Sequence, residues 1–180
     1  VRESFDPAPI NDVSVFETTI RVLGGFLGAY ALSGDELYKE KSVLLADRLI
    51  HAFDTTTGIP ASVVNLKEGA GKTVMHNPFN GQTYKFGDTT TLAEAGSLQL
   101  ELQYLSHITG NATYAARGDR ATARIFSIGK RRGGGNPPLP KADEPFNLAH
   151  TTFPVDLHPR EGRFMTDRVS MGSGGDSFYE

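Results

Sequence analysis

The segment SVFETTIRVLGGFLGAYAL, residues 14–32, decides the fold. Large apolar residues recur in it every three or four positions, which places them on one face of a helix. These residues are Phe16, Ile20, Leu23, Leu27 and Tyr30. Val22 and Phe26 add a second apolar strip. The segment therefore predicts a helix that is covered on more than one side.

Outward from this segment, the chain predicts pairs of helices. SGD at 33–35 ends the first helix and begins a second, predicted over 36–53, because Gly favours helix ends and Asp favours helix starts. A second pair is predicted over 91–109 and 112–128. Apolar residues at helical spacing mark the inner faces of these helices. They are Leu45, Leu49, Phe53, Leu98, Leu102 and Leu105.

The two pairs resemble each other in sequence. LSGD with a following Tyr38 recurs as ITGN with a following Tyr114. Repeated helical hairpins that cannot bury their apolar faces alone are typical of helical arrays. We therefore predict an all-α fold of helical hairpins, and we take residues 1–180 as one domain.

Two long segments lack helical periodicity. Residues 54–90 are rich in Gly, Thr, Pro and Asn, and residues 129–171 hold six of the ten prolines. We predict both as long loops, with one extended piece at 152–157. Structureless connections of this length in a compact domain usually carry function or are disordered.

Composition excludes several classes of partner. The net charge is −3, and the one basic run, KRR at 130–132, leads into three glycines without interleaved aromatic residues. Nucleic-acid binding is therefore not expected. We expect no membrane segment, because no apolar run approaches the ~20 residues that a spanning helix needs. The chain has no Cys, so it cannot form a disulfide. Asn111-Ala112-Thr113 is an N-glycosylation sequon.

Three acidic residues begin alternate helices of the array. They are Glu17, Glu94 and Asp176, each three residues after a Ser or Thr. One interpretation is a ring of carboxylates at one mouth of the array, suited to acid–base work on a glycosidic bond. The other is three helix caps, each stabilising its own helix by roughly 0.5–2 kcal/mol. Spacing alone favours the caps.

The face of Glu17 has further unusual features. Arg21 follows it at i+4, and Gly24 and Gly28 continue the same face. A glycine inside a helix costs roughly 1 kcal/mol relative to alanine. Two of them indicate a place where another group approaches the backbone closely.

The sequence does not support a phosphate-binding loop, a zinc site or a serine nucleophile. The run GAGKT at 69–73 lacks the earlier glycine of a phosphate-binding loop, since that position is Leu66. The five histidines show no i+2 or i+4 spacing that would indicate a zinc site. No Gly-x-Ser-x-Gly nucleophile motif occurs.

Four motifs in order carry a family resemblance. SVFETTIRVLGG at 14–25, AFDT with GIP and VNL between 52 and 66, LAEAGSLQLE at 92–101 and GDSFYE at 175–180 resemble glycoside hydrolase family 47, the class I α-1,2-mannosidases. The resemblance implies part of an (α/α)7 barrel that hydrolyses α-1,2-linked mannose with inversion. The implied ligand is the high-mannose oligosaccharide of glycoproteins.

The resemblance also implies residue roles. Glu17 is similar in position to the proton donor, acting through a water, and Asp176 to the second active-site carboxylate. Arg21, Glu94 and Glu180 are similar to sugar-contacting residues. The resemblance implies calcium in the barrel, and we expect the calcium-binding Thr and the catalytic base beyond Glu180, with no metal ligand inside this chain.

We further expect this chain to be the first half to third of a catalytic domain, and to be inactive alone. The complete protein is expected to be monomeric and to act in the ER or Golgi, or as a secreted protein, with its targeting segment outside this chain. Family members often carry Arg or Leu where this chain has Gly174, so the preferred mannose branch stays open.

Two alternatives remain open. The first is a non-hydrolysing mannose-binding lectin of glycoprotein quality control and ER-associated degradation, built on the same barrel. The second is a helical-repeat scaffold that binds protein, which predicts an apolar or charged groove instead of a carboxylate-lined mouth. LAEAGSLQLE at 92–101 resembles the hydrolysing branch.

Overall fold

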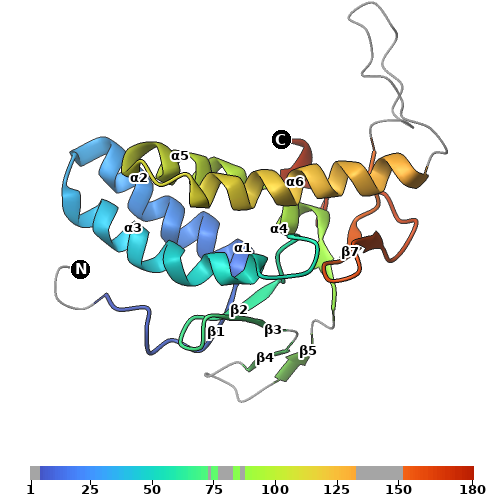
Figure 1. Ribbon diagram of the computed structural model, residues 1–180, viewed down its shortest axis with the longest axis horizontal. Coiled ribbons are helices and arrows are strands. Elements are labelled where there is room, and N and C mark those ends of the chain that lie inside the picture. The colour runs from blue at the N-terminus through green and yellow to red at the C-terminus, as the bar shows by residue number, and fades with distance from the viewer. Residues whose placement is uncertain (1–4, 73, 77–82, 86–87, 133–151) are drawn as a thin grey trace, which may run out of the picture.

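The computed structural model describes residues 5–72, 74–76, 83–85, 88–132 and 152–180. Two helical hairpins form its main body, and short strands lie along one side of them (Figure 1). The helices are α1 (Val15–Thr18), η1 (Thr19–Leu23, π-helical), α2 (Gly24–Ser33), α3 (Glu36–Leu49), η2 (Ile50–Phe53, 3₁₀), α4 (Leu92–Gly96), α5 (Gln99–Thr109), α6 (Thr113–Arg132) and α8 (Asp176–Tyr179). The strands are β1 (Asp12–Ser14), β2 (Val63–Asn65), β3 (Ala70–Lys72), β4 (Val74–His76), β5 (Thr83–Lys85), β6 (Thr90–Thr91), β7 (Asp156–His158) and β8 (Arg163–Phe164).

The first hairpin forms where the periodicity predicts it. Gly34 ends α2 with φ 67°, a left-handed conformation that glycine adopts without steric cost. The Asp35 side chain then accepts a hydrogen bond from Leu37 N at 3.0 Å and begins α3. The last four residues of the predicted second helix form the 3₁₀ turn η2, and Leu45, Leu49 and Phe53 are buried as expected.

The first helix contains a π-helical turn that the periodicity did not predict. Gly24 N donates to Thr19 O across five residues instead of four. This wider turn changes the angular spacing of the side chains within it. Leu23 and Leu27 are buried as expected, whereas Ile20 is 38% exposed, so its expected place on the buried face is wrong.

The second hairpin differs from the prediction at both of its helices. The helix expected over 91–109 is interrupted at 97–98, between α4 and α5. Leu98, Leu102 and Leu105 are nevertheless buried on one face. The helix α6 runs to Arg132, beyond its predicted end at 128.

Short strands replace much of the loop expected at 54–90. Antiparallel β2 is the central strand between β1 and β3, with Val13 opposite Val64 and Val64 opposite Gly71. The physical reason is burial: all three residues of β2 are buried, and buried backbone groups require hydrogen-bond partners. Strands β4 and β5 form a separate antiparallel pair.

The loop expected at 129–171 is also corrected. Its first residues belong to α6, and β6, β7 and β8 form an antiparallel sheet, with Thr91 opposite Asp156 and Leu157 opposite Phe164. Part of the extended piece expected at 152–157 lies in β7. Residues 133–151 of this segment lie outside the described residues.

In the part of the chain that the structure describes, the core consists of two buried clusters. The larger fills the space between the hairpins and includes Leu23, Leu45 and Leu105. The smaller, around Leu92 and Leu157, joins α4 and α6 to the second sheet. Val22 packs against the larger cluster, and the Phe26 ring meets the Phe5 ring edge-on at 4.9 Å. The second apolar strip of the first helix is therefore partly covered, although only 22% of the most apolar stretch of Val15–Ser33 is buried among the described residues.

One helix in the described residues is long and apolar enough to cross a membrane, so the expectation that no apolar run approaches that length is wrong. It spans Val15–Ser33, with 19 residues and a mean hydropathy of 1.2. Length and composition alone are weak grounds for a membrane assignment, because core helices also meet them. Here the helix is one arm of the first hairpin and contributes Leu23 and Leu27 to the core.

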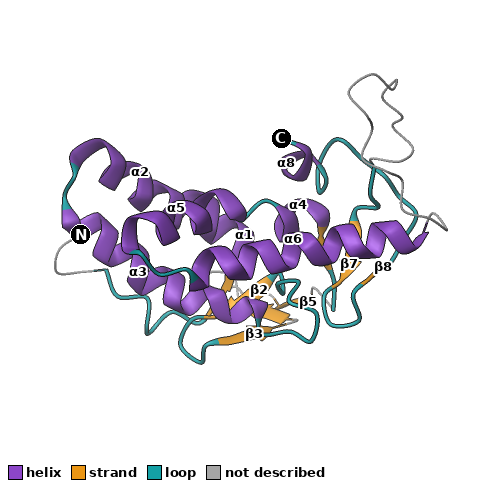
Figure 2. Ribbon diagram, turned by 45° about the horizontal axis from the view of Figure 1, so that its top comes forward, coloured by secondary structure: helices purple, strands orange, loops and turns teal. Residues whose placement is uncertain are grey.

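Strands and helices occupy different sides of the molecule. Figure 2 shows the helices lying together, with β2, β3 and β5 along one side and β7 and β8 toward the far end of α6. The helices α1 and α4 each begin directly at the end of a strand, β1 and β6 respectively. The two sheets therefore set the positions of these helix starts.

Candidate active site

Two of the three predicted acidic residues lie at strand-to-helix junctions. Ser14 is the last residue of β1 and the N-cap of α1, where its hydroxyl accepts from Glu17 N at 3.2 Å. Thr91 is the last residue of β6 and the N-cap of α4, where its hydroxyl accepts from Glu94 N at 3.2 Å. Pairing in the sheets fixes the cap residues, and the caps in turn fix the helix starts.

Ser62 joins these two junctions. Its carbonyl oxygen accepts a hydrogen bond from Val15 N at 2.9 Å, at the start of α1. Its hydroxyl lies 3.1 Å from Glu94 Oε2 and 3.0 Å from Thr89 O, so one proton serves two acceptors. Ser62 is 6% exposed. A buried residue from the predicted loop thus connects the helix of Glu17 to the carboxylate of Glu94.

Glu94 is held firmly in place. Its Oε2 accepts from Thr91 N at 2.9 Å, which completes a capping box, and it lies 3.4 Å from the Thr90 hydroxyl. With Ser62, three donors converge on this one oxygen. The carboxylate therefore caps its helix as the spacing predicted, and the same contacts keep it in one orientation.

Glu17 has a different environment. Its carboxylate pairs with the Arg21 guanidinium, and the two side chains are 49% and 72% exposed. An exposed pair of this kind contributes little to stability, about 0–1 kcal/mol. The pair lies on the surface of the helix, where a ligand has access to it.

Asp176 begins α8, but not through the expected cap. The N-cap of α8 is Gly175, without a side-chain hydrogen bond, so the predicted capping by Ser173 is wrong. Gly174 has φ 87°, a conformation strained for other residues, and this turn carries the chain into α8 in a different geometry. Asp176 is partly buried, and its Oδ1 accepts from Ser177 N at 3.0 Å.

Contacts with α4 hold α8 in place. Ala93 N donates to Gly174 O at 2.9 Å. The Phe178 ring lies against Gly96, so closely that a Cβ atom there would overlap it. The Tyr179 hydroxyl accepts from Phe153 N at 2.7 Å. The small helix that carries Asp176 is therefore docked on the helix that carries Glu94.

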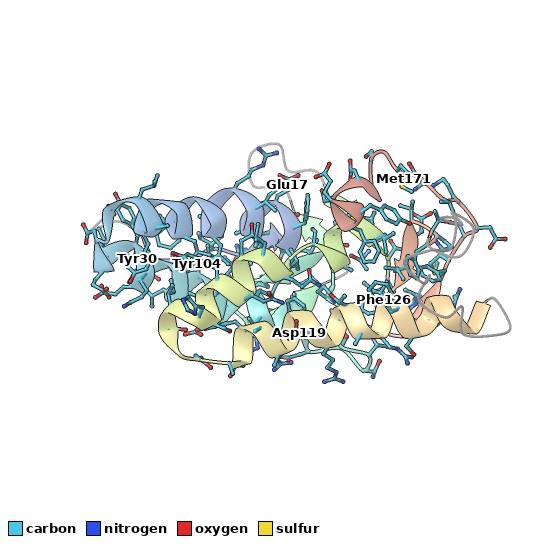
Figure 3. All side chains as sticks on the ribbon, turned by 90° about the horizontal axis from the view of Figure 1, so that it is seen from above. Glu17, Tyr30, Tyr104, Asp119, Phe126 and Met171 are labelled. Carbon is cyan, nitrogen blue, oxygen red and sulfur yellow. The ribbon has the colours of Figure 1, made fainter. Side chains whose placement is uncertain are left out.

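The structure brings the three acid-bearing helices into contact, α1 with α4 and α4 with α8. Figure 3 shows Glu17 at the edge of the molecule on which Met171, just before α8, also lies. Glu180 is exposed and follows α8 directly, with its backbone N donating to Asp176 O at 3.3 Å. A pocket of about 160 Å³ beside Ser62 is lined by none of the five predicted site residues.

Two residues of this region were not singled out from the sequence. Ser62 lies in a segment predicted as loop, and no local pattern marks its contact with Glu94. Glu101 lies within the motif at 92–101, seven residues after Glu94, a spacing that could have identified it. Its carboxyl is beside Gly24, where a Cβ atom would lie 3.3 Å from Glu101 Oε1.

Contact at the glycines of the first helix is uneven. The close approach expected there occurs at Gly24, through Glu101. At Gly28 a Cβ atom would meet nothing within 4 Å, so the expectation is wrong for that residue. Within the described ranges, no three His, Asp or Glu side chains gather as a metal site would require.

Comparison with known proteins identifies the family. The model of glycosyl hydrolase family 47 matches residues 1–180. The chain belongs to this family. Among family 47 relatives, it is 38% identical over 180 residues to mannosyl-oligosaccharide 1,2-alpha-mannosidase IB of Mus musculus. It is 36% identical over 170 residues, 94% of the chain, to the endoplasmic reticulum mannosyl-oligosaccharide 1,2-alpha-mannosidase of Schizosaccharomyces pombe.

A solved structure of a family 47 member supports the same assignment. The alpha-1,2-mannosidase from Trichoderma reesei matches 93% of this chain and 32% of its own, with a TM-score of 0.64 and 27% identity. The hairpins therefore form part of the (α/α)7 barrel of family 47, as the resemblance implied. The chain spans about a quarter of the length of the curated relatives it matches, 24% for the mouse enzyme and 27% for the yeast enzyme.

Proposed function

We propose that the protein containing this chain removes terminal α-1,2-linked mannose from high-mannose N-glycans as an inverting glycoside hydrolase. The observation that carries this proposal is the joining of three carboxylate-bearing helix starts, α1 to α4 through Ser62 and α4 to α8 through Gly174. Family membership and the names of the relatives support the substrate class.

Each predicted residue has a role that its environment supports. Glu17, exposed on its helix, protonates the leaving oxygen through a water, and Asp176 is the second carboxylate of the site. Arg21 orients Glu17 and has further N–H groups for sugar hydroxyls. Glu94 and Glu180 accept hydrogen bonds from the sugar, and Glu94 does so as a rigid group because three donors hold it.

The test compares the kcat of Glu17→Gln with that of Glu36→Gln. Both variants are made in the complete protein, by which we mean the longest natural polypeptide that contains these 180 residues. Glu36 is a matched control, since it also lies in the first turn of a helix and pairs with a cation on its own helix, Lys39. We expect E17Q to lower kcat by roughly 10²–10⁴-fold because it removes proton transfer. E36Q should stay within about twofold of the parent.

The outcomes separate the candidate functions. If E17Q stays within about threefold of the parent in kcat, Glu17 is a helix cap and not the acid. A parent that binds the oligosaccharide without hydrolysing it would instead support the lectin alternative. Inversion predicts β-mannose as the first-formed product, which proton NMR of the fresh reaction detects.

We also propose that the complete protein needs calcium, which would act on the bound sugar as an oxygen-ligated cation. The described residues do not gather a ligand set, so none of the roles above depends on the ion. Chelation with EDTA should abolish hydrolysis, and added calcium should restore it. Full activity after exhaustive chelation would refute this requirement.

We propose, finally, that the protein acts in the secretory pathway and carries a glycan on Asn111. Asn111 and Thr113 are exposed, and Asn111 Oδ1 accepts from Thr113 N at 3.1 Å. A glycan on Nδ2 leaves this contact intact. Thr113→Ser should keep the mass shift that peptide-N-glycosidase removes, and Thr113→Val should lose it. A parent without the shift would refute glycosylation.

A further inference from the structure

Glu101 is a partly buried acidic residue with no role in the reaction described above. It lies in the first turn of α5, and its Oε2 is buried without a hydrogen-bond partner among the described residues. A polar atom in that state usually costs stability. The contacts of Glu101 indicate a use that could offset this cost.

The contact of Glu101 is with the helix that carries Glu17 and Arg21. A Cβ atom at Gly24 would lie 3.3 Å from Glu101 Oε1 and 3.5 Å from Thr19 O. The carboxyl group and the carbonyl of the π-helical turn therefore face the same small space. A side chain at residue 24 would narrow that space, because even its Cβ atom would make a tight contact with Glu101 Oε1.

The turn that Glu101 contacts is the irregular part of the helix. The π-helical segment Thr19–Leu23 contains Arg21 and directly follows the turn of Glu17. Single π-helical turns are less stable than α-helix and frequently occur at functional sites, where neighbouring groups must maintain them. Burial raises the pKa of Glu101, against a smaller lowering by its backbone N–H.

The two acid-bearing helices meet at matching positions. Gly24 follows Glu17 by seven residues, and Glu101 follows Glu94 by seven. In each case an interruption lies between them, η1 in the first helix and residues 97–98 in the second. The contact of Glu101 with Gly24 therefore joins the two helices on the C-terminal side of their acidic residues. Ser62 joins the same helices at their starts.

We propose that Glu101 is a positioning residue: its carboxyl group fills the space beside Gly24, supports the π-helical turn Thr19–Leu23 and so sets the direction in which Glu17 and Arg21 project. It acts through these residues and does not touch the sugar, because its Oε2 is buried. The inference rests on the proposed function and adds to it a residue that determines the geometry of the acid.

The test measures kcat and KM of the complete protein on an α-1,2-linked mannobioside. Glu101→Ala empties the space and should lower kcat by about tenfold or more, since small displacements of reacting groups cost up to roughly 10²-fold. KM should change by less than about threefold. Glu101→Gln keeps the shape and should recover at least about a third of the parental kcat.

Gly24→Ala and Gly28→Ala form a matched pair. Both place a methyl group on the same helix, but only the methyl at residue 24 presses on Glu101. G24A should lower kcat severalfold, and G28A should leave it within about twofold of the parent. In the double variant G24A/E101A the methyl group has room, so its kcat should be no lower than that of E101A.

The results overturn the inference in distinguishable ways. An active parent whose E101A variant keeps kcat within about twofold shows that Glu101 has no positioning role. Equal effects of G24A and G28A, or a kcat of E101Q as low as that of E101A, refute the filling of the space beside Gly24. A parent inactive on every α-1,2-mannoside refutes the proposed function and this inference with it.

Discussion

The hydroxyl of Ser62 lies 3.1 Å from the carboxylate oxygen Oε2 of Glu94, across 32 positions of the chain. The same residue accepts a backbone hydrogen bond from Val15, two residues before Glu17. One buried serine thus sets the relative positions of two helix starts. Glu17 and Glu94 therefore lie on helices whose starts are held together by Ser62, a residue distant from both in sequence.

Ser62→Ala removes one of the three donors to Glu94. Hydrogen bonds to charged groups contribute about 1.5–3 kcal/mol, so we expect a loss of that order in the free energy of unfolding. Urea unfolding of the complete protein measures it. Ser33→Ala is the control, because the exposed Ser33 hydroxyl bonds to two nearby backbone groups, Ala29 O and Asp35 N. Equal losses for the two variants would contradict the role assigned to Ser62.

Thr91→Ala removes the cap of α4. Loss of an N-cap hydroxyl costs about 0.5–2 kcal/mol, and here it also breaks the capping box that orients Glu94. Thr91→Ser keeps the hydroxyl and should retain most of the stability. Denaturant midpoints compare the two variants. The capping assignment would be wrong if the serine variant were as unstable as the alanine variant.

Gly96→Ala should reverse the usual effect of this substitution. Alanine normally stabilises a helix interior relative to glycine by roughly 0.5–1 kcal/mol. At residue 96 its methyl group overlaps the Phe178 ring, so overpacking should cost about 1–3 kcal/mol and displace α8 with Asp176.

The control for this variant is Gly25→Ala, where a Cβ atom meets nothing within 4 Å. Limited proteolysis near α8, together with the unfolding midpoint, distinguishes the two. If G96A and G25A are equally stable and equally resistant, Phe178 does not hold α8 against α4.

Glu101→Gln should change how stability depends on pH. Burial raises the pKa of Glu101 in the folded protein above the ordinary value of 4.5. A group with a raised folded pKa contributes stability below its unfolded pKa and loses it as pH rises through the folded pKa. The parent should therefore become less stable relative to E101Q as pH increases from about 4 toward neutrality. Unfolding titrations across this range measure the difference, and a constant difference would contradict the burial of the carboxyl group.

How far local sequence determines this structure is clear from the helices. Leu45 and Leu49, or Leu102 and Leu105, are buried because residues three or four apart share a helix face whatever lies elsewhere in the chain. Gly34 and Gly110 end their helices in left-handed conformations for an equally local reason. The same local motifs led to the family.

The strands and the site geometry depend on distant partners instead. The sequence of residues 63–65 has no pattern that indicates pairing with Asp12–Ser14 or Ala70–Lys72. The short central strand was therefore predicted as loop. The cap expected from Ser173 failed because packing of Phe178 on Gly96 and the turn at Gly174 position α8.

The sequence by itself determined the two helical hairpins, the acidic residues at or near helix starts and the membership in family 47. Tertiary structure alone decided the π-helical turn at Thr19–Leu23, the place of Ser62 between two helix starts and the contact of Glu101 with Gly24. The physical reason is the range of the interactions. Helix periodicity and caps act within about one turn, whereas a buried hydroxyl or carboxyl group is positioned by whichever segments the completed fold packs around it.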